Sequence, residues 1–340
     1  KVVDDNGEAV FFGNVALYKQ GTLIRGGETD LEGNYVIGNL DPGTYDVEFS
    51  YTGLQSKKYE GVIVYGGKTN KLDAELSTGV VLDEVVVIAY EVPLVEQDNT
   101  TQGGTVTSEQ IRQLPTRNIN AIATLTAGAS SADEGDAISI RGSRSNATDY
   151  YIDGVRVSGA LIPESEIEQL QVITGGMEAK YGDVTGGIIS ITTKGPSQRF
   201  SGSAEVETSK KLDPYDNNIV GLGLSGPIIK NKEGQSILGY RVSGRYTYRG
   251  DDDPNAIPVY RATDAKIAEI AGTPFTLLNN TRVPTAELLT NEDVIALDSR
   301  PFEASERLDL TAKLEARLSK SIDIAFTGSY SASENQFTPG

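Results

Sequence analysis

The chain has 340 residues, and its 48 acidic against 30 basic residues give a formal net charge of −18. This charge would repel a phosphate backbone, which argues against nucleic-acid binding. The sequence has no cysteine and no histidine, so thiol nucleophiles, imidazole bases, disulfides and zinc sites are excluded from this stretch. No run of apolar residues reaches the roughly 18 to 20 that a membrane-spanning helix needs. We therefore expect no enzyme, no resident metal and no cofactor.

Residues 1–77 contain short β-prone segments separated by turn residues. Every second residue from Tyr45 to Tyr51 is aromatic or aliphatic, which predicts a strand with one buried face. The turns at Asp30–Asn34 and Leu40–Gly43 supply residues with restricted or positive φ. This spacing favours a small antiparallel sandwich, with strands at Ala9–Tyr18, Tyr35–Gly38, Thr44–Tyr51, Gly61–Tyr65 and Lys71–Leu76.

A β-prone strip at Val80–Tyr90 follows the sandwich, and a polar stretch from Glu91 to Gly104 shows neither helical nor strand periodicity. One interpretation makes the strip the last strand of the sandwich. The other makes it a segment that adds as an edge strand to a partner protein, because backbone hydrogen bonds then matter more than side-chain identity. The residues alone leave both interpretations open.

Residues 105–195 mix helical and strand patterns with many glycines. Ser108 is expected to cap a helix at Glu109–Leu114, which ends before Pro115, and apolar residues at helical spacing predict a second helix at Asn118–Thr126. The pattern indicates an α+β domain, with strands at Ala137–Arg141, Asp149–Ile152, Val155–Ser158, Ile167–Thr174 and Gly187–Thr193.

The last 145 residues contain longer alternating segments. From Leu308 to Leu318 every second residue is apolar and the residues between are polar or charged, and the alternation resumes at Ile322 after a short turn. One face of such a strand is suited to lipid and the other to water. A soluble sandwich is the alternative for these hairpins. Three further strands are expected at Phe200–Ser209, Ile219–Ile228 and Leu238–Arg249, ahead of a long segment from Gly250 to Glu306.

Several blocks resemble TonB-dependent outer-membrane receptors of the Bacteroidetes type. The segments Thr29–Tyr35 and Asp41–Tyr45 are similar to the carboxypeptidase regulatory-like module at the front of such receptors. Four later blocks stand in the order of the receptor plug domain: Ile138–Gly142, Tyr151–Val155, Ile167–Gly176 and Tyr181–Lys194.

The resemblance implies a mainly β protein in four parts. These are a transthyretin-like β-sandwich at 1–77, a TonB-box-like segment with a linker at 78–104, an α+β plug domain at 105–195, and the first five or so strands of an incomplete transmembrane antiparallel β-barrel at 196–340. Because an unclosed sheet would leave unpaired backbone groups in lipid, we expect further strands beyond Gly340. 

The function implied by the resemblance is TonB-dependent import of a ligand across the outer membrane, with the plug gating the barrel. The sandwich would then lie on the periplasmic side and the long loops outside the cell. The TonB C-terminal domain would contact Asp83, Glu84, Val85, Val86, Val87, Ile88 and Ala89. Other implied partners are outer-membrane lipid, the transported ligand, whose identity the sequence does not give, and further outer-membrane proteins or a lipoprotein lid. The block Met177–Asp183 departs from the pattern of the nutrient receptors that carry such a lid.

Ten plug residues are expected to have structural roles: Arg141, Gly142, Asp153, Gly154, Gly175, Gly176, Tyr181, Gly182, Gly186 and Gly187. The glycines indicate tight turns and close backbone approach. Arg141 resembles the plug arginine that docks on carboxylates of the inner barrel wall, and a plain surface charge is its alternative. Two other functions stay open: a structural component of a larger outer-membrane complex, and a soluble multi-domain adhesin.

Overall fold

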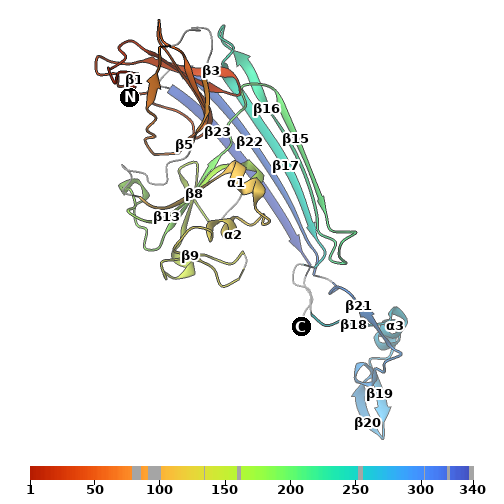
Figure 1. The fold of residues 1–340 in the computed structure, drawn as a ribbon. Helices are drawn as coiled ribbons and strands as arrows, with labels where there is room; N and C mark the ends of the chain where they lie inside the picture. Colours follow the sequence, from red (N-terminus) through yellow and green to blue (C-terminus); the bar gives the residue numbers. More distant parts are fainter. Residues whose placement is uncertain are drawn as a thin grey trace. The chain divides into compact units, whose positions relative to one another are not determined.

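A computed structural model describes residues 1–78, 86–90, 101–133, 135–158, 162–251, 256–301, 303–319 and 322–336. The chain divides into two compact units. The first comprises residues 1–202, 223–243 and 310–329, and the second comprises 203–222, 244–309 and 330–340. The first unit contains a sandwich, an α+β domain and one part of each of five further strands, which Figure 1 labels by element.

The sandwich is built on a five-stranded sheet in the order β3-β2-β4-β5-β7. The expected alternation in the third of the predicted strands is confirmed, because Tyr45, Val47 and Phe49 are all buried, whereas Tyr51 lies past the strand end and is 40% exposed. The strands of this sheet are β2 (Asn14–Lys19), β3 (Thr22–Glu28), β4 (Gly43–Ser50), β5 (Lys57–Val64) and β7 (Val86–Ala89), and a parallel pair is formed by β1 (Val2–Asp4) and β6 (Ala74–Leu76).

One strand expected in the sandwich is absent, and one strand that the sequence did not predict is present. Residues 35–38 form no strand; instead, the Tyr35 hydroxyl donates to the carbonyl of Leu72 at 2.6 Å, which places its ring against the core. Conversely, β3 was missed because Gly26 and Gly27 interrupt its apolar alternation. A two-residue turn with positive φ at Gln20 and Gly21 pairs β3 with β2, so the partner strand rather than local propensity determines this strand.

The α+β domain has a five-stranded sheet in the order β12-β11-β14-β13-β8. Side chains from one face of this sheet form a continuous apolar core with the two short helices, and this core includes Ile122, Leu170, Val172 and Ile191. The elements are β8 (Gln102–Thr107), α1 (Ser108–Gln113), α2 (Ile119–Ala123), the pair β9 (Ala129–Ser130) and β10 (Ser139–Ile140), β11 (Asp149–Ile152), β12 (Val155–Val157), β13 (Ile167–Gly175) and β14 (Ile188–Thr193), with 3₁₀ turns η1 (Ser145–Ala147), η2 (Glu164–Glu166) and η3 (Ala179–Tyr181).

The entry into this domain differs from the expectation. Residues 102–104 were read as part of a linker without strand character, but they belong to β8, which pairs antiparallel with β13. The residue that caps α1 is Thr107 rather than Ser108, and it forms a capping box with Gln110. The strand ends directly in the cap, so tertiary pairing with β13 sets the first residue of the helix.

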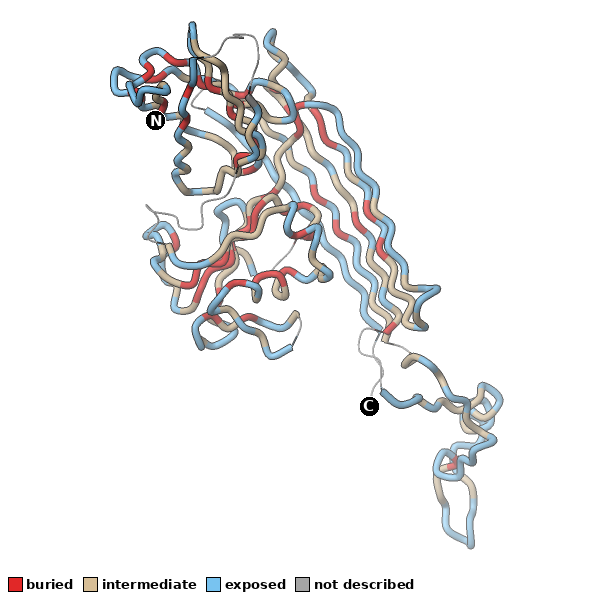
Figure 2. The backbone as a smooth tube through the Cα atoms, in the orientation of Figure 1, coloured by how far each residue is buried: buried red, intermediate tan, exposed pale blue. Residues whose placement is uncertain are grey.

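The long strands form a sheet in the order β15-β16-β17-β22-β23. Their burial is opposite to that of a water-soluble sheet: Leu310 and Leu314 are 44% and 46% exposed, whereas Asp309 and Thr311 are buried. Figure 2 shows buried residues between exposed ones along β16 and β22, whereas every residue of β23 is exposed. The apolar row thus faces outward, as in the wall of a membrane barrel. The strands are β15 (Ser201–Thr208), β16 (Asn218–Lys230), β17 (Ser236–Arg249), β22 (Ser305–Ser319) and β23 (Ile322–Asn335).

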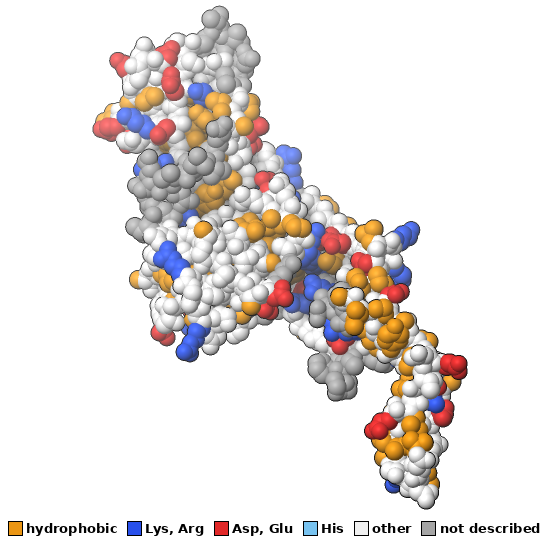
Figure 3. All heavy atoms as spheres, turned by 60° about the horizontal axis from the view of Figure 1, so that its bottom comes forward, with side chains coloured by type: hydrophobic (Ala, Val, Ile, Leu, Met, Phe, Trp, Pro, Cys, Tyr) orange, Lys and Arg blue, Asp and Glu red, His pale blue; other side chains and the backbone are white. Residues whose placement is uncertain are grey.

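The long connection between β17 and β22 has structure of its own. At its base the backbone N–H of Arg300 donates to the buried carboxylate of Asp251 at 2.7 Å. Many of its apolar side chains are exposed, and Figure 3 shows them along its surface. Sequence reasoning treated this part only as a loop. It contains β18 (Val259–Ala262), α3 (Asp264–Gly272), the hairpin of β19 (Phe275–Leu278) and β20 (Thr281–Pro284), η4 (Thr285–Leu288) and β21 (Val294–Leu297).

Across the described residues, none of the helices combines the length and the apolar character that a membrane crossing requires.

Candidate functional site

The β7 segment lies at one edge of the sandwich sheet. Its residues pair in parallel with β5, with Val87 opposite Lys58 and Ala89 opposite Glu60. The N–H of Tyr90 extends the pairing by donating to the carbonyl of Glu60 at 2.9 Å. No strand pairs with the other edge of β7 in the part of the chain that the structure describes. An edge strand of this kind can accept a further strand from another protein.

Only part of the expected TonB-contact segment can be placed. Asp83, Glu84 and Val85 lie outside the described residues, and Val86–Ala89 form β7. The structure is compatible with both interpretations of the strip. As the outermost strand, β7 completes the sandwich sheet, and its unpaired edge in the described residues is also suited to a partner strand.

The turn at Asp153 and Gly154 ties the α+β domain to a long strand. Both residues have positive φ, 47° and 83°, which gives the two-residue hairpin between β11 and β12. The Asp153 carboxylate accepts from the N–H of Thr193 at 2.8 Å and from Lys313 of β22 at 3.4 Å. Lys313 also donates to the Thr193 hydroxyl at 3.0 Å. Asp153 thus acts as a contact point within the first unit as well as a turn residue.

Two carboxylates that sequence reasoning missed lie beside this contact. Glu164 and Glu166 of η2 are each only 4% exposed. The Arg241 side chain of β17 binds Glu166 with two hydrogen bonds, Nε to Oε2 at 2.6 Å and Nη2 to Oε1 at 3.1 Å, and Arg117 lies 3.8 Å from Glu164. A bidentate arginine–carboxylate pair is strong and directional. In the sequence these acids stand in a polar turn, and no local signal distinguishes them from surface charge.

Lys194 completes this charged cluster. Its Nζ donates to the carbonyl of Ser165 at 2.5 Å. Burial, together with the nearby charges of Arg112 and Arg241, lowers the pKa of Lys194 from 10.5 to about 8. The lysine is therefore held where its charged form is disfavoured, because desolvation and like charges both penalise the ammonium.

Arg141 lies on the α+β domain itself. Its φ is 52°, its side chain is exposed, and its guanidinium donates to the side chain of Gln102 on β8. No carboxylate pairs with it among the residues that the structure describes. A Cβ at Gly175 would lie 2.9 Å from Arg141 Nη1, so this glycine leaves room for the guanidinium. The expected docking of Arg141 on a barrel carboxylate stays a prediction.

The remaining expected plug residues differ in how strongly the fold constrains them. A Cβ at Gly187 would lie 2.2 Å from Ile140 Cδ1, and one at Gly186 would lie 2.4 Å from the carbonyl oxygen of Ala147. At Gly182 a Cβ would meet no atom within 4 Å. Tyr181 is buried and packs edge-on against Tyr151, with ring centroids 4.9 Å apart. Gly142 and Gly176 have positive φ of 75° and 64°.

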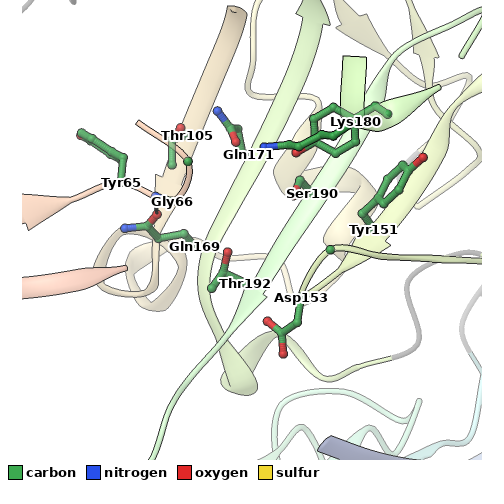
Figure 4. Close-up of a pocket in the computed structure, with 13 residues that line it drawn as sticks. Tyr65, Gly66, Thr105, Tyr151, Asp153, Gln169, Gln171, Lys180, Ser190 and Thr192 are labelled. Carbon is green, nitrogen blue, oxygen red and sulfur yellow. Dashed lines mark hydrogen bonds between the residues drawn. The ribbon is translucent and has the colours of Figure 1, made fainter. Parts of the chain in front are cut away.

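A pocket of about 370 Å³, lined by both polar and aromatic side chains, lies in the first unit between a sandwich loop and the face of the α+β sheet that carries Gln169 and Gln171. Gln169 joins the two domains with both ends of its amide: Nε2 donates to the carbonyl of Val64 at 2.6 Å, and Oε1 accepts from the N–H of Gly66 at 3.1 Å. In Figure 4 Tyr65 and Gly66 lie on one side of the pocket, and Tyr151 and Lys180 lie on the other. The described residues contain no cluster of three or more acidic ligands that could hold a metal ion.

Comparison with known families gives the class of protein. Residues 1–77 match the carboxypeptidase regulatory-like domain, and residues 96–188 match the TonB-dependent receptor plug domain. The α+β domain described above is thus a plug, and the sandwich is a regulatory-like domain. The chain is homologous to TonB-dependent outer-membrane receptors, which are transporters and not enzymes.

Named relatives fall in the same class. The chain is 27% identical to the TonB-dependent transporter Oar of Myxococcus xanthus over 240 residues, which are 60% of this chain and 22% of that protein. A probable TonB-dependent siderophore receptor, PirA of Acinetobacter baumannii, is 36% identical over 95 residues, 27% of this chain and 12% of that receptor. The chain therefore spans at most about a fifth of these relatives. The crystal structure of the siderophore receptor PirA from Pseudomonas aeruginosa aligns with a TM-score of 0.45 at 22% identity, covering 68% of this chain and 36% of that one.

Proposed function

We propose that this chain takes part in TonB-dependent import of a ligand across the outer membrane, and that the segment Asp83–Ala89 is the strand that TonB engages. The observation that carries the proposal is β7, an open-edged strand that stands between a regulatory-like sandwich and a plug domain. TonB would add a strand through backbone hydrogen bonds, which suits the β-branched run Val85–Ile88 within this segment.

The plug contacts support a gating role. The Glu166–Arg241 pair and the Asp153–Lys313 contact join the plug to long strands of the same unit. Both are charge-assisted contacts, which have directional geometry but can be exchanged for water when they open. Force applied to the segment before the plug would have to break or rearrange them for a ligand to pass. We place the sandwich on the periplasmic side, where TonB acts, and the long connection after β17 outside the cell.

The ligand class is the first thing to assay. Two of the named relatives carry siderophore receptor in their names, and a protein of Vibrio cholerae that is 30% identical over 148 residues, 38% of this chain and 21% of that protein, is an iron-regulated outer membrane virulence protein. Ferric siderophores are therefore the first ligands to offer to cells that express the receptor. 

The test is to replace Val87 by proline. Proline has no N–H, so it removes a donor from the strand, and we expect loss of ligand uptake with normal surface expression and normal ligand binding. Val87→Thr is the matched control, since it keeps both the N–H and the β-branched shape. Uptake that is unchanged in Val87→Pro would contradict the assignment. A receptor that assembles with other outer-membrane proteins but imports none of the offered ligands, even as wild type, would favour a structural role instead.

A further inference from the structure

The two edges of β7 are not equivalent. The N–H of Tyr90 points toward β5, where it meets the carbonyl of Glu60. Because backbone groups of successive strand residues alternate between the two edges, the N–H of Ile88 also points toward β5. The backbone groups of Val87 and Ala89 then point toward the open edge. Among the described residues, the sandwich pairs with one edge of this strand and nothing pairs with the other.

The side chains of β7 and Tyr90 also alternate between the core and the solvent. Tyr90 is partly buried and packs against the core of the sandwich. Val87 is 56% exposed, and Ala89 is exposed as well. The aromatic ring therefore anchors the end of the segment to the sandwich, while the side chains of Val87 and Ala89 lie on the face of the sheet that points away from the core.

We propose that the sandwich acts as a platform that presents β7 to TonB. An edge strand of the TonB domain adds to the open edge of β7 while β5 holds the other edge, so that one sheet continues from the sandwich into TonB. This inference rests on the proposed function, because it takes the segment to be the one that TonB engages. It adds that the sandwich belongs to the binding site, and that a pull by TonB on β7 reaches the sandwich before it reaches the plug.

Two physical arguments favour presentation over release. Holding β7 extended before binding removes much of the conformational entropy that TonB would otherwise have to overcome. Displacing β5 would break the backbone pairing and expose the Tyr90 ring. TonB would form no more backbone hydrogen bonds in this way than it can form at the unpaired edge. A strand that is already extended on one side is therefore the better template.

A disulfide that locks β7 onto β5 separates the two mechanisms. These 340 residues contain no cysteine, so the pair Glu60→Cys and Ala89→Cys, which are register partners with exposed side chains, would supply the only thiols in this part of the receptor. The pair Asn14→Cys and Glu28→Cys, partners in β2 and β3, is the matched control on the other half of the sheet. Binding of the purified TonB C-terminal domain to the full-length receptor in detergent is measured with each pair oxidised and reduced.

The lock has three informative outcomes. If the oxidised receptor binds TonB within about twofold of the reduced receptor, β7 is used while it is attached to the sandwich, as proposed. If oxidation abolishes binding and reduction restores it, β7 must leave the sandwich, which overturns the platform but keeps the TonB segment. If the wild type itself fails to bind the TonB domain, the proposed function fails first.

A second variant tests the platform without introduced cysteines, which could themselves disturb the fold. Tyr90→Ala removes the anchor, and we expect about tenfold weaker binding of TonB, because part of the entropy of ordering the segment moves into the binding step. Tyr51→Ala, a partly exposed aromatic residue beyond β4, is the control and should bind as wild type. Tighter binding by Tyr90→Ala would mean that the sandwich withholds the segment, and the platform would be rejected.

Discussion

The plug sheet and the sheet of long strands use the same alternation in opposite ways. In the plug, Leu170, Val172 and Ile189 are fully buried against the helices, and the other face of the sheet combines polar side chains such as Gln171 with a smaller apolar cluster around Ile173. In the long strands, Leu310 and Phe326 are exposed, and Asp309 and Thr311 are buried. A period of two residues therefore predicts a two-faced strand but not which face is covered. That choice depends on the solvent around the sheet, which is water for the plug and lipid for the outer face of a barrel.

The polar inner side of the long strands has a further consequence. Arg241 on β17 and Lys313 on β22 reach plug carboxylates on Glu166 and Asp153. An apolar inner side could not hold these acids, because a buried carboxylate needs a charged or hydrogen-bonding partner. The inverted burial of the long strands is thus what makes the plug contacts possible.

The largest expected effect comes from breaking such a contact. Glu166→Gln leaves the Arg241 side chain, which is only 18% exposed, without its counter-charge. We expect a loss of about 3–5 kcal/mol in the free energy of unfolding, measured by denaturant titration of the receptor in detergent. Glu178→Gln removes a carboxylate from an exposed pair with Lys180 and should cost less than about 1 kcal/mol. Equal losses in the two variants would show that the buried pair contributes no more to the free energy of unfolding than the exposed pair.

The next prediction tests the two solvents directly. Leu310→Arg places a charge in the outward row of β22, and we expect a cost of about 2–4 kcal/mol if that row lies near the middle of a bilayer. Val36→Arg, at a sandwich position that is 92% exposed, should change the free energy of unfolding by less than about 0.5 kcal/mol. The measurement is unfolding in lipid vesicles. If both arginines are tolerated equally, water rather than lipid surrounds the apolar row.

The smallest expected effect concerns Lys194. Its pKa is about 8 in the folded chain and 10.5 without the surroundings of the fold. Between these values the unfolded chain binds more protons, so stability rises as the pH rises from about 8 to about 10.5, and below about 8 the penalty is constant. We expect Lys194→Met to be more stable than the parent at pH 7.5. The difference in the free energy of unfolding should shrink by on the order of 1–3 kcal/mol toward pH 10. If the difference in the free energy of unfolding between Lys194→Met and the parent is the same at pH 7.5 and pH 10, the lowered pKa of Lys194 is contradicted.

The local pattern was sufficient for much of the fold. Alternation identified the long strands and β4, the helix cap signals identified α1 to within one residue, and the blocks at Ile138–Gly142 and Tyr181–Lys194 identified the plug. The turn at Asp153 and Gly154 was also readable, because only a few residue types accept positive φ. These features depend on interactions between residues close in sequence, so the sequence carries them directly.

Other features depend on residues far apart in the chain. The strands β3 and β8 have weak patterns of their own and form because β2 and β13 offer them partners. The burial of Glu166 follows from an arginine 75 residues away, and the place of β7 follows from the free edge of β5. Sequence alone therefore determined which segments are two-faced or capped. Only the tertiary structure decided which face is covered and which charges meet, because pairing and desolvation arise when distant segments come together.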